Sequence, residues 1–229
     1  PLYYKKKQDQ PICFVFMMDW CKSKYVPLFD LLRGRCPECK LVLYLEDIVA
    51  SRKGEFEFPL LKYFDRVVTF DKGDSEKYNF LYCPTFMSKL DIREDITQKS
   101  NACYWGEDKG RASIINAVYK KLTENGLICN FLVAKKGKGT RLEEGIKAAK
   151  HGKPYSTYLS AVANSDIIVE IMNKNAVGFT LRTWEALLYN KVLLTNNQSI
   201  VESPYYKPEQ MVVFDDIEGI DIEYIKRVI

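Results

Sequence analysis

The most constraining feature of this chain is a repeated alternation between short apolar runs and segments with helical spacing. In the first half, apolar runs occur at residues 12–18, 40–45, 66–70 and 81–83. Runs of this length, apolar on both faces and rich in β-branched residues, are typical of buried parallel strands. Short helices are predicted between them, at residues 25–32 and 59–63.

The second half repeats the alternation with clearer helical patterns. Helices are predicted at 111–125, 141–150, 155–164, 180–189 and from about 220 onward, and strands at 102–105, 128–133, 167–171, 192–195 and 211–214. Strands that alternate with helices imply right-handed βαβ units and a parallel sheet covered on both faces. We therefore predict an α/β fold with two Rossmann-like domains, residues 1–95 and 96–229, the first small or truncated.

Composition and charge exclude several classes of protein. The chain has 229 residues, of which 47% are hydrophobic and 28% charged, as in ordinary globular proteins. Its longest uncharged apolar stretch, residues 11–18, is far shorter than the ~20 residues of a membrane-spanning helix. The net charge of +4 is spread evenly over the two halves. An even spread disfavours a nucleic-acid partner, so we expect none.

The seven cysteines show no disulfide spacing. Cys36 and Cys39 form the one CxxC pair, and no second pair follows at the spacing of a zinc ribbon. We therefore expect no metal site, and reduced thiols in a cytoplasmic protein.

Ligands of open parallel sheets bind outside the carboxyl ends of the strands, which singles out two loops. The first is the turn after strand 102–105, where Gly106, Lys109, Gly110 and Arg111 could hold an anion on backbone N–H groups and cations. The chain has neither a P-loop nor a GxGxxG fingerprint. The alternative interpretation is an ordinary turn between a strand and a helix.

The second loop joins the strand that contains Glu170 to the helix predicted from Thr180. Thr180 is a natural N-cap, and Gly178 lets the backbone approach a ligand. Arg182 then lies in the first helical turn, where the helix dipole disfavours a cation unless a polyanion binds there too. Glu185, one turn further on, could accept two sugar hydroxyls. The alternative interpretation is a capped amphipathic helix with a surface arginine.

These motifs resemble the nucleotide-sugar-binding domain of GT-B glycosyltransferases, in particular bacterial enzymes that build lipopolysaccharide or other surface polysaccharides. The resemblance rests on the order of five motifs: Tyr-Trp-Gly-x-x-Lys-Gly-Arg (104–111), Pro-Tyr-x-x-Tyr-Leu (154–159), Ser-Asp (165–166), Gly-Phe-Thr-Leu-Arg-x-Trp-Glu-Ala-Leu (178–187) and Val-Leu-Leu-Thr-Asn-Asn (192–197). Residues 1–95 resemble the acceptor domain only in their strand–helix rhythm.

The resemblance implies a metal-independent transfer of a hexosyl or related group from a nucleoside-diphosphate sugar, with no cofactor. Its donor-binding residues would be Gly106, Lys109, Arg111, Glu170, Gly178, Phe179, Thr180, Leu181, Arg182 and Glu185. Arg182 would also be catalytic, since it meets the charge that develops on the leaving diphosphate. Retaining enzymes of this type often carry two glutamates eight positions apart, but Val177 stands eight before Glu185. The stereochemical outcome is therefore open.

An inverting enzyme would need a base, and the carboxylates at the ends of the first domain's strands are the candidates: Asp19 first, then Glu46 and Asp47. No D-x-D triplet is present, which disfavours the metal-dependent type of glycosyltransferase.

A glycan or lipid-linked acceptor follows from the resemblance, with peripheral contact to the inner membrane through the basic residues 135–153. A solvated helix and loop is the alternative interpretation of these residues. For the chain as a whole, the alternatives are a non-catalytic nucleotide-sugar-binding module and a ligand-free scaffold of flavodoxin-like domains.

Overall fold

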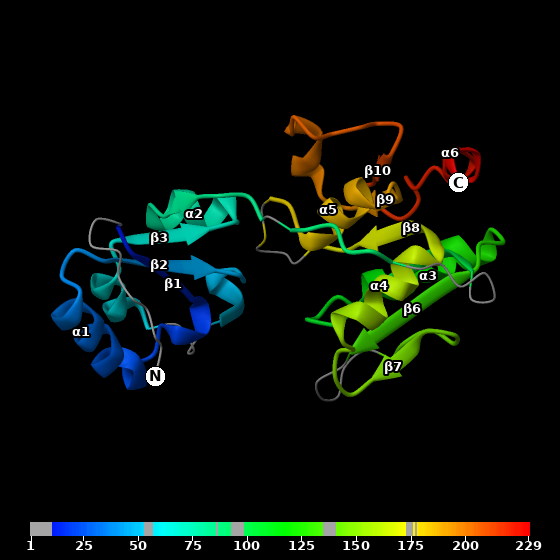
Figure 1. Cartoon of the computed structure of the whole chain (residues 1–229). Helices are drawn as coiled ribbons and strands as arrows, with labels where there is room; N and C mark the ends of the chain where they lie inside the picture. Colours follow the sequence, from blue (N-terminus) through cyan, green and yellow to red (C-terminus); the bar gives the residue numbers. More distant parts are fainter. Residues whose placement is uncertain are drawn as a thin grey trace. The chain divides into compact units, whose positions relative to one another are not determined.

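The computed structural model describes residues 11–52, 57–85, 87–92, 99–134, 141–172, 176 and 178–229. The chain divides into two compact units, the first made mostly of residues up to Pro84 and the second made mostly of residues from Thr85 onward (Figure 1). The predicted domain boundary, between residues 95 and 96, lies outside the described residues.

The first unit is a parallel sheet with strand order β1-β2-β3-β4. Its strands are β1 (Cys13–Met17), β2 (Lys40–Leu45), β3 (Arg66–Thr69) and β4 (Leu81–Tyr82), and its helices are α1 (Val26–Arg35) and α2 (Lys72–Tyr78), with 3-10 turns at Met18–Trp20, Ser23–Tyr25, Val49–Arg52 and Phe58–Tyr63. The predicted strands are confirmed. Helix α2 was not predicted, because its sequence is almost entirely polar. It is started by Asp71, whose carboxylate accepts the Asp74 N–H at 2.8 Å.

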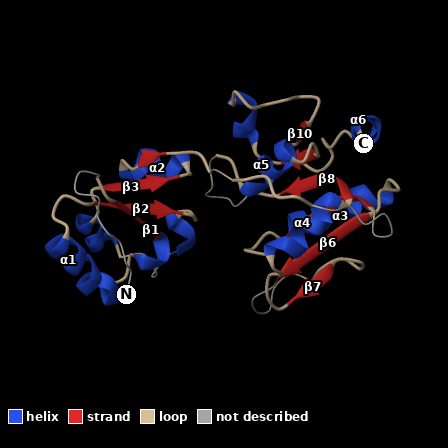
Figure 2. Ribbon diagram, in the orientation of Figure 1, coloured by secondary structure: helices blue, strands red, loops and turns tan. Residues whose placement is uncertain are grey.

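The second unit contains the strands β5 (Ser100–Glu107), β6 (Cys129–Ala134), β7 (Lys147–Ala149), β8 (Ser165–Glu170), β9 (Val192–Thr195) and β10 (Met211–Val213), and the helices α3 (Ala112–Glu124), α4 (Tyr155–Ala163), α5 (Leu181–Leu188) and α6 (Ile222–Val228), with a 3-10 turn at Gln198–Glu202. All its strands are parallel, in the order β10-β9-β8-β5-β6-β7 (Figure 2). The chain thus forms β5, β6 and β7 from the centre of the sheet to one edge. It then returns to the centre and forms β8, β9 and β10 towards the other edge. This is the Rossmann order, which reverses between β5 and β8.

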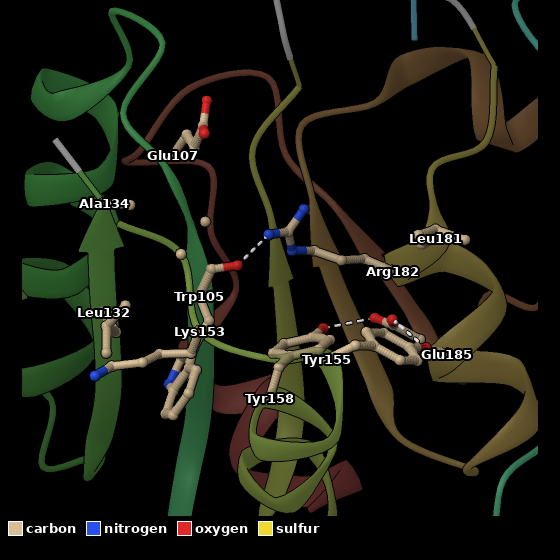
Figure 3. A pocket seen from close by; sticks show the side chains of 12 residues that line it. Trp105, Glu107, Leu132, Ala134, Lys153, Tyr155, Tyr158, Leu181, Arg182 and Glu185 are labelled. Carbon is tan, nitrogen blue, oxygen red and sulfur yellow. Dashed lines mark hydrogen bonds between the residues drawn. The ribbon is translucent and has the colours of Figure 1, made fainter. Parts of the chain in front are cut away.

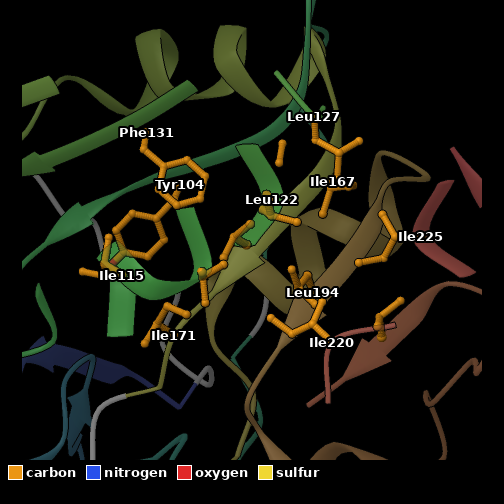
Figure 4. Close-up of a cluster of buried hydrophobic side chains, with 14 of the residues drawn as sticks. Tyr104, Ile115, Leu122, Leu127, Phe131, Ile167, Ile171, Leu194, Ile220 and Ile225 are labelled. Carbon is orange, nitrogen blue, oxygen red and sulfur yellow. The ribbon is translucent and has the colours of Figure 1, made fainter. Parts of the chain in front are cut away.

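In each central strand, the side chains of neighbouring residues point to opposite faces of this sheet, because the strand is pleated. Tyr104 of β5 and Ile167 of β8 belong to the larger core, together with Ile115 and Leu122 of α3 (Figure 4). On the other face, Cys103 packs in a second cluster that includes Val162 of α4 and Ala186 of α5. With both faces buried, the strands need continuous apolar sequences, which is why they were recognisable.

The predicted helix at residues 141–150 is wrong. Gly145 has a φ of +94°, which a helix does not permit. The residues that follow form β7 instead, in which Ala148 pairs with Val133 at the edge of the sheet. The larger fold prediction is confirmed: both units are α/β, with parallel sheets and interleaved helices.

Candidate functional site

A pocket of about 270 Å³ lies at the carboxyl ends of β5 and β6 and the start of α5, beside the place where the strand order of the second unit reverses. Its lining residues are Trp105, Gly106, Glu107, Leu132, Ala134, Gly152, Lys153, Tyr155, Tyr158, Leu181, Arg182 and Glu185 (Figure 3). We call it the β5 pocket. Ligands of this sheet topology bind outside the carboxyl edge at the reversal, so the fold and the pocket indicate the same region.

Thr180 starts α5 as the sequence predicted. Its hydroxyl accepts the Arg182 N–H at 3.1 Å, which confirms the N-cap. The Arg182 side chain then extends from the first helical turn to β5, where its Nη2 donates to the carbonyl of Trp105. Figure 3 shows the Arg182 guanidinium next to the Trp105 backbone, with a dashed line for this hydrogen bond.

The Arg182 guanidinium has capacity left for a ligand. Its carbon lies 5.2 Å from the centre of the Tyr104 ring, a cation–π contact. Among the described residues, neither Arg182 Nε nor the Tyr104 hydroxyl has a hydrogen-bond partner, although both atoms are buried. Buried polar atoms are normally hydrogen-bonded, so these two atoms leave hydrogen-bonding capacity unused next to a cation that lines the pocket.

Gly106 makes room for this arrangement. A Cβ at residue 106 would lie 2.8 Å from Arg182 Nη2 and 3.2 Å from the Tyr104 hydroxyl. A side chain there would push the guanidinium away from β5. The glycine that the sequence marked as an anion-binding turn residue therefore acts by admitting Arg182.

Glu185 lines the pocket but is itself almost completely covered, with 1% of its surface exposed. Its two oxygens accept hydrogen bonds from Tyr155, at 2.9 Å, and from Tyr158, at 2.5 Å. Burial raises the pKa of Glu185 above its usual range, against the opposing effects of the tyrosine hydroxyls and of Arg182. Burial and the Glu185 charge also raise the pKa of both tyrosines, which therefore remain protonated donors at neutral pH.

Glu170, predicted to bind the donor, is fully buried and does not line the pocket. Its carboxylate accepts hydrogen bonds from three threonine hydroxyls: Thr180 at the start of α5, Thr183 within α5 at 3.1 Å, and Thr195 at the end of β9 at 2.6 Å. This arrangement ties three elements together: β8, the start of α5 and the end of β9. Its contacts are those of a structural residue.

The Arg111 guanidinium also forms hydrogen bonds within the protein. It donates to the carbonyls of Glu107, at 2.7 Å, Asp108, at 3.2 Å, and Ile171. These bonds join the loops that follow β5 and β8. Lys109, next to it, is exposed and has a φ of +44°, within the turn that leads into α3. Neither residue lines the pocket.

Of the donor-binding residues predicted around the start of α5, some are exposed and others pack inside the protein. Leu181 is 46% exposed and lines the pocket. The Phe179 ring instead packs edge-on against Trp184, at 5.6 Å between ring centres. Gly178 has a φ of +126°, and its carbonyl accepts from Asn197 at 2.8 Å. Val177 lies outside the described residues.

The three candidate bases lie after the strands of the first unit. Asp19 follows β1, is 61% exposed, and forms ion pairs with Lys22 at 3.6 Å and Arg52 at 3.8 Å. Asp47 follows β2 and pairs with the same Arg52 at 3.5 Å. Glu46 accepts the Met18 N–H at 2.9 Å. The structure thus places Asp19 and Asp47 around one arginine at the carboxyl edge of the first sheet.

Sequence reasoning missed several lining residues, above all Tyr155 and Tyr158. A signal was present, because tyrosines three apart share one face of a helix. These tyrosines, like Tyr104 and Trp105, belong to the motifs at residues 154–159 and 104–111, but the sequence assigned them no role.

In the described part of the chain, no helix is both long enough and apolar enough to cross a membrane. No group of three or more His, Cys, Asp or Glu side chains in those residues is arranged to hold a metal ion.

No protein-family model and no curated protein sequence matches the chain. Solved structures do. An alpha-glucosyltransferase in complex with UDP and a 13-mer DNA containing a HMU base matches with a TM-score of 0.57 and 11% identity, over 94% of this chain and 70% of that one. The alpha-glucosyltransferase in complex with UDP-glucose and DNA containing an abasic site gives a TM-score of 0.59 at 11% identity, with the same coverage.

TarM matches with a TM-score of 0.56 and 10% identity, over 94% of this chain and 47% of its own. Similarity at this level of identity concerns the fold. The chain therefore has the α/β fold, with two Rossmann-like units of the GT-B type, that these structures share.

Proposed function

We propose that the chain is a glycosyltransferase whose second unit binds a nucleoside-diphosphate sugar at the β5 pocket. The observation that carries the proposal is Arg182: a cation at the start of a helix, held against a strand end and stacked on Tyr104. In the described part of the chain, its buried Nε and the Tyr104 hydroxyl both lack a hydrogen-bond partner. A diphosphate supplies the charge and the acceptor oxygens that these groups lack. The UDP and UDP-glucose of the alpha-glucosyltransferase complexes support uridine donors as the first to test.

In the proposed reaction, the bond between the anomeric carbon and the diphosphate oxygen breaks, and its electron pair stays on the leaving nucleoside diphosphate. An acceptor oxygen forms the new bond to that carbon and gives its proton to a base. Arg182 and the N-terminal end of α5 stabilise the negative charge that develops on the diphosphate, so we propose a metal-independent reaction. Asp19 remains our first candidate base for an inverting reaction.

A glycan or lipid-linked acceptor in surface-polysaccharide synthesis remains part of the proposal. It is supported by the motif order and by the exposed cations Arg141, Lys147, Lys150 and Lys153, since each basic residue near an anionic membrane contributes about 1 kcal/mol. Residues 135–140 of this basic segment lie outside the described residues. The DNA in the alpha-glucosyltransferase complexes supports nucleic acid as a rival acceptor class, so acceptor assays should include both lipid-linked glycans and DNA.

A thermal-shift screen with UDP, GDP, ADP, CMP and their sugars tests donor binding, with uridine as the control without phosphates. A ligand at 100 times its Kd adds about 2.7 kcal/mol of stability, which raises the Tm of a chain of this size by roughly 5–10 °C. We expect a nucleoside diphosphate to give this shift and uridine to give little. Unchanged melting with every nucleotide would contradict the proposal. Turnover of the donor that binds would then separate a transferase from a binding module.

Two glycines of the pocket provide a matched pair of variants. Gly106→Ala places a Cβ 2.8 Å from Arg182 Nη2, the flexible end of a side chain that can move aside. We therefore expect UDP affinity to fall about tenfold, with a small change in stability. Gly152→Ala adds the same methyl group where nothing lies within 4 Å, so its UDP affinity should equal that of the wild type. Calorimetric titration measures both, and equal losses in the two variants would count against the role given to Gly106.

A further inference from the structure

The carboxylate of Glu185 lines the β5 pocket but is covered by other side chains of the chain. Glu185 lines the pocket, yet each of its oxygens already accepts a tyrosine hydroxyl from α4, Oε1 from Tyr155 and Oε2 from Tyr158. Figure 3 shows the two phenol rings next to the carboxylate, with dashed lines for the two hydrogen bonds. A ligand hydroxyl cannot take the place of either bond without moving a tyrosine.

The two tyrosines are held very differently. Tyr155 is 40% exposed and is the first residue of α4, directly after Pro154, so little packing opposes the rotation of its side chain. Tyr158 lies one turn further along the helix. Its ring packs between those of Trp105, with 6.4 Å between centres, and Tyr155, with 5.9 Å. Tyr155 can therefore leave the carboxylate while Tyr158 keeps it in position.

The carboxylate needs a replacement partner if Tyr155 leaves. Glu185 is buried, and a buried carboxylate oxygen without a hydrogen bond is costly. A ligand that displaces Tyr155 must therefore bring a hydroxyl donor of its own. Glu185 lies one helical turn after Arg182, so a donor with its diphosphate at Arg182 can place a neighbouring sugar ring near Glu185.

We infer that Tyr155 is a displaceable cap on Glu185, and that a ribose hydroxyl of the donor replaces the Tyr155 hydroxyl at Oε1. This inference rests on the proposed function. It makes Tyr155 a specificity-determining residue: a nucleotide with ribose hydroxyls recovers the broken hydrogen bond, and a nucleotide without them does not. Tyr158 is a positioning residue that stays on Oε2 throughout.

The test compares UDP with 2′,3′-dideoxy-UDP in the wild type and in Tyr155→Phe, by calorimetric titration. In the variant, Oε1 lacks its partner until the ribose arrives, and a hydrogen bond to a charged group is worth enough to change affinity at least tenfold. We expect Tyr155→Phe to bind UDP about tenfold more tightly than the wild type. The two proteins should bind dideoxy-UDP with equal affinity.

Tyr158→Phe is the matched control, since it removes the same hydroxyl from the same helix but leaves Tyr155 on Oε1. It should not bind UDP more tightly than the wild type. Equal or weaker UDP binding by Tyr155→Phe would overturn the cap, and an equal gain for dideoxy-UDP would overturn the ribose as the displacing group. If none of the three proteins binds UDP, the cap fails together with the proposed function, whereas a wild type that binds UDP leaves the proposed function standing.

Discussion

Replacing Arg182 with alanine is expected to weaken UDP binding about 100-fold, because the substitution removes the pocket-lining cation that stacks on Tyr104 at β5. The same change removes the hydrogen bond to the Trp105 carbonyl. A single hydrogen bond of this kind contributes about 1–3 kcal/mol to stability, so the variant should fold. Calorimetric titration with UDP measures the loss, and circular dichroism confirms the fold.

Arg227→Ala is the matched control for this variant. Arg227 also stacks on a tyrosine, with its guanidinium carbon 5.6 Å from the Tyr224 ring, but it belongs to α6 and does not line the pocket. Its removal should leave UDP affinity unchanged. Comparable affinities in the Arg182 and Arg227 variants would show that Arg182 does not bind the diphosphate.

Glu170→Ala is expected to cause the largest loss of stability, about 3 kcal/mol. The substitution leaves three threonine hydroxyls without their shared acceptor and opens a cavity beneath the start of α5. A buried charge is itself costly, which keeps the expected loss below the sum of three charged hydrogen bonds. Urea unfolding measures it. In a Trp20→Phe background, only Trp105 and Trp184 report on unfolding, and both belong to the second unit.

The control for Glu170 is an exposed glutamate that also has a partner. Glu218 is 88% exposed and forms an ion pair with Lys121 at 2.6 Å. Because exposed ion pairs contribute about 0–1 kcal/mol, Glu218→Ala should change stability very little. If Glu170→Ala unfolds at the same urea concentration as the Glu218 variant, the carboxylate does not hold the three elements together.

The strands were predictable because their sequences are apolar almost throughout, as in residues 41–45 and 192–194. In the second unit the reason is that side chains cover both faces of the sheet. The start of α5 was predictable because Thr180 is a local signal that acts within two residues. Helix α2 and strand β7 were missed for the opposite reason. Their sequences are polar or ambiguous. Helix α2 has a local N-cap, Asp71, but lacks the apolar pattern of a helix, and β7 forms only by pairing with the distant strand β6.

For the site, sequence could identify the right loops but not the partners of each side chain. Glu170 and Arg111 had the chemistry of ligands, and the fold instead directs them to threonine hydroxyls and backbone carbonyls. The reverse holds for Tyr155 and Tyr158, whose role depends on Glu185, about thirty residues further along the chain. Only the folded chain shows which polar groups are already satisfied and which, like Arg182 Nε, are not.

The most direct test of the central claim is a crystal structure of the chain with UDP. The account predicts density for the diphosphate within hydrogen-bonding distance of the Arg182 guanidinium, above Gly106 and the carboxyl end of β5. UDP bound elsewhere on the chain, or a diphosphate out of reach of Arg182, would contradict it.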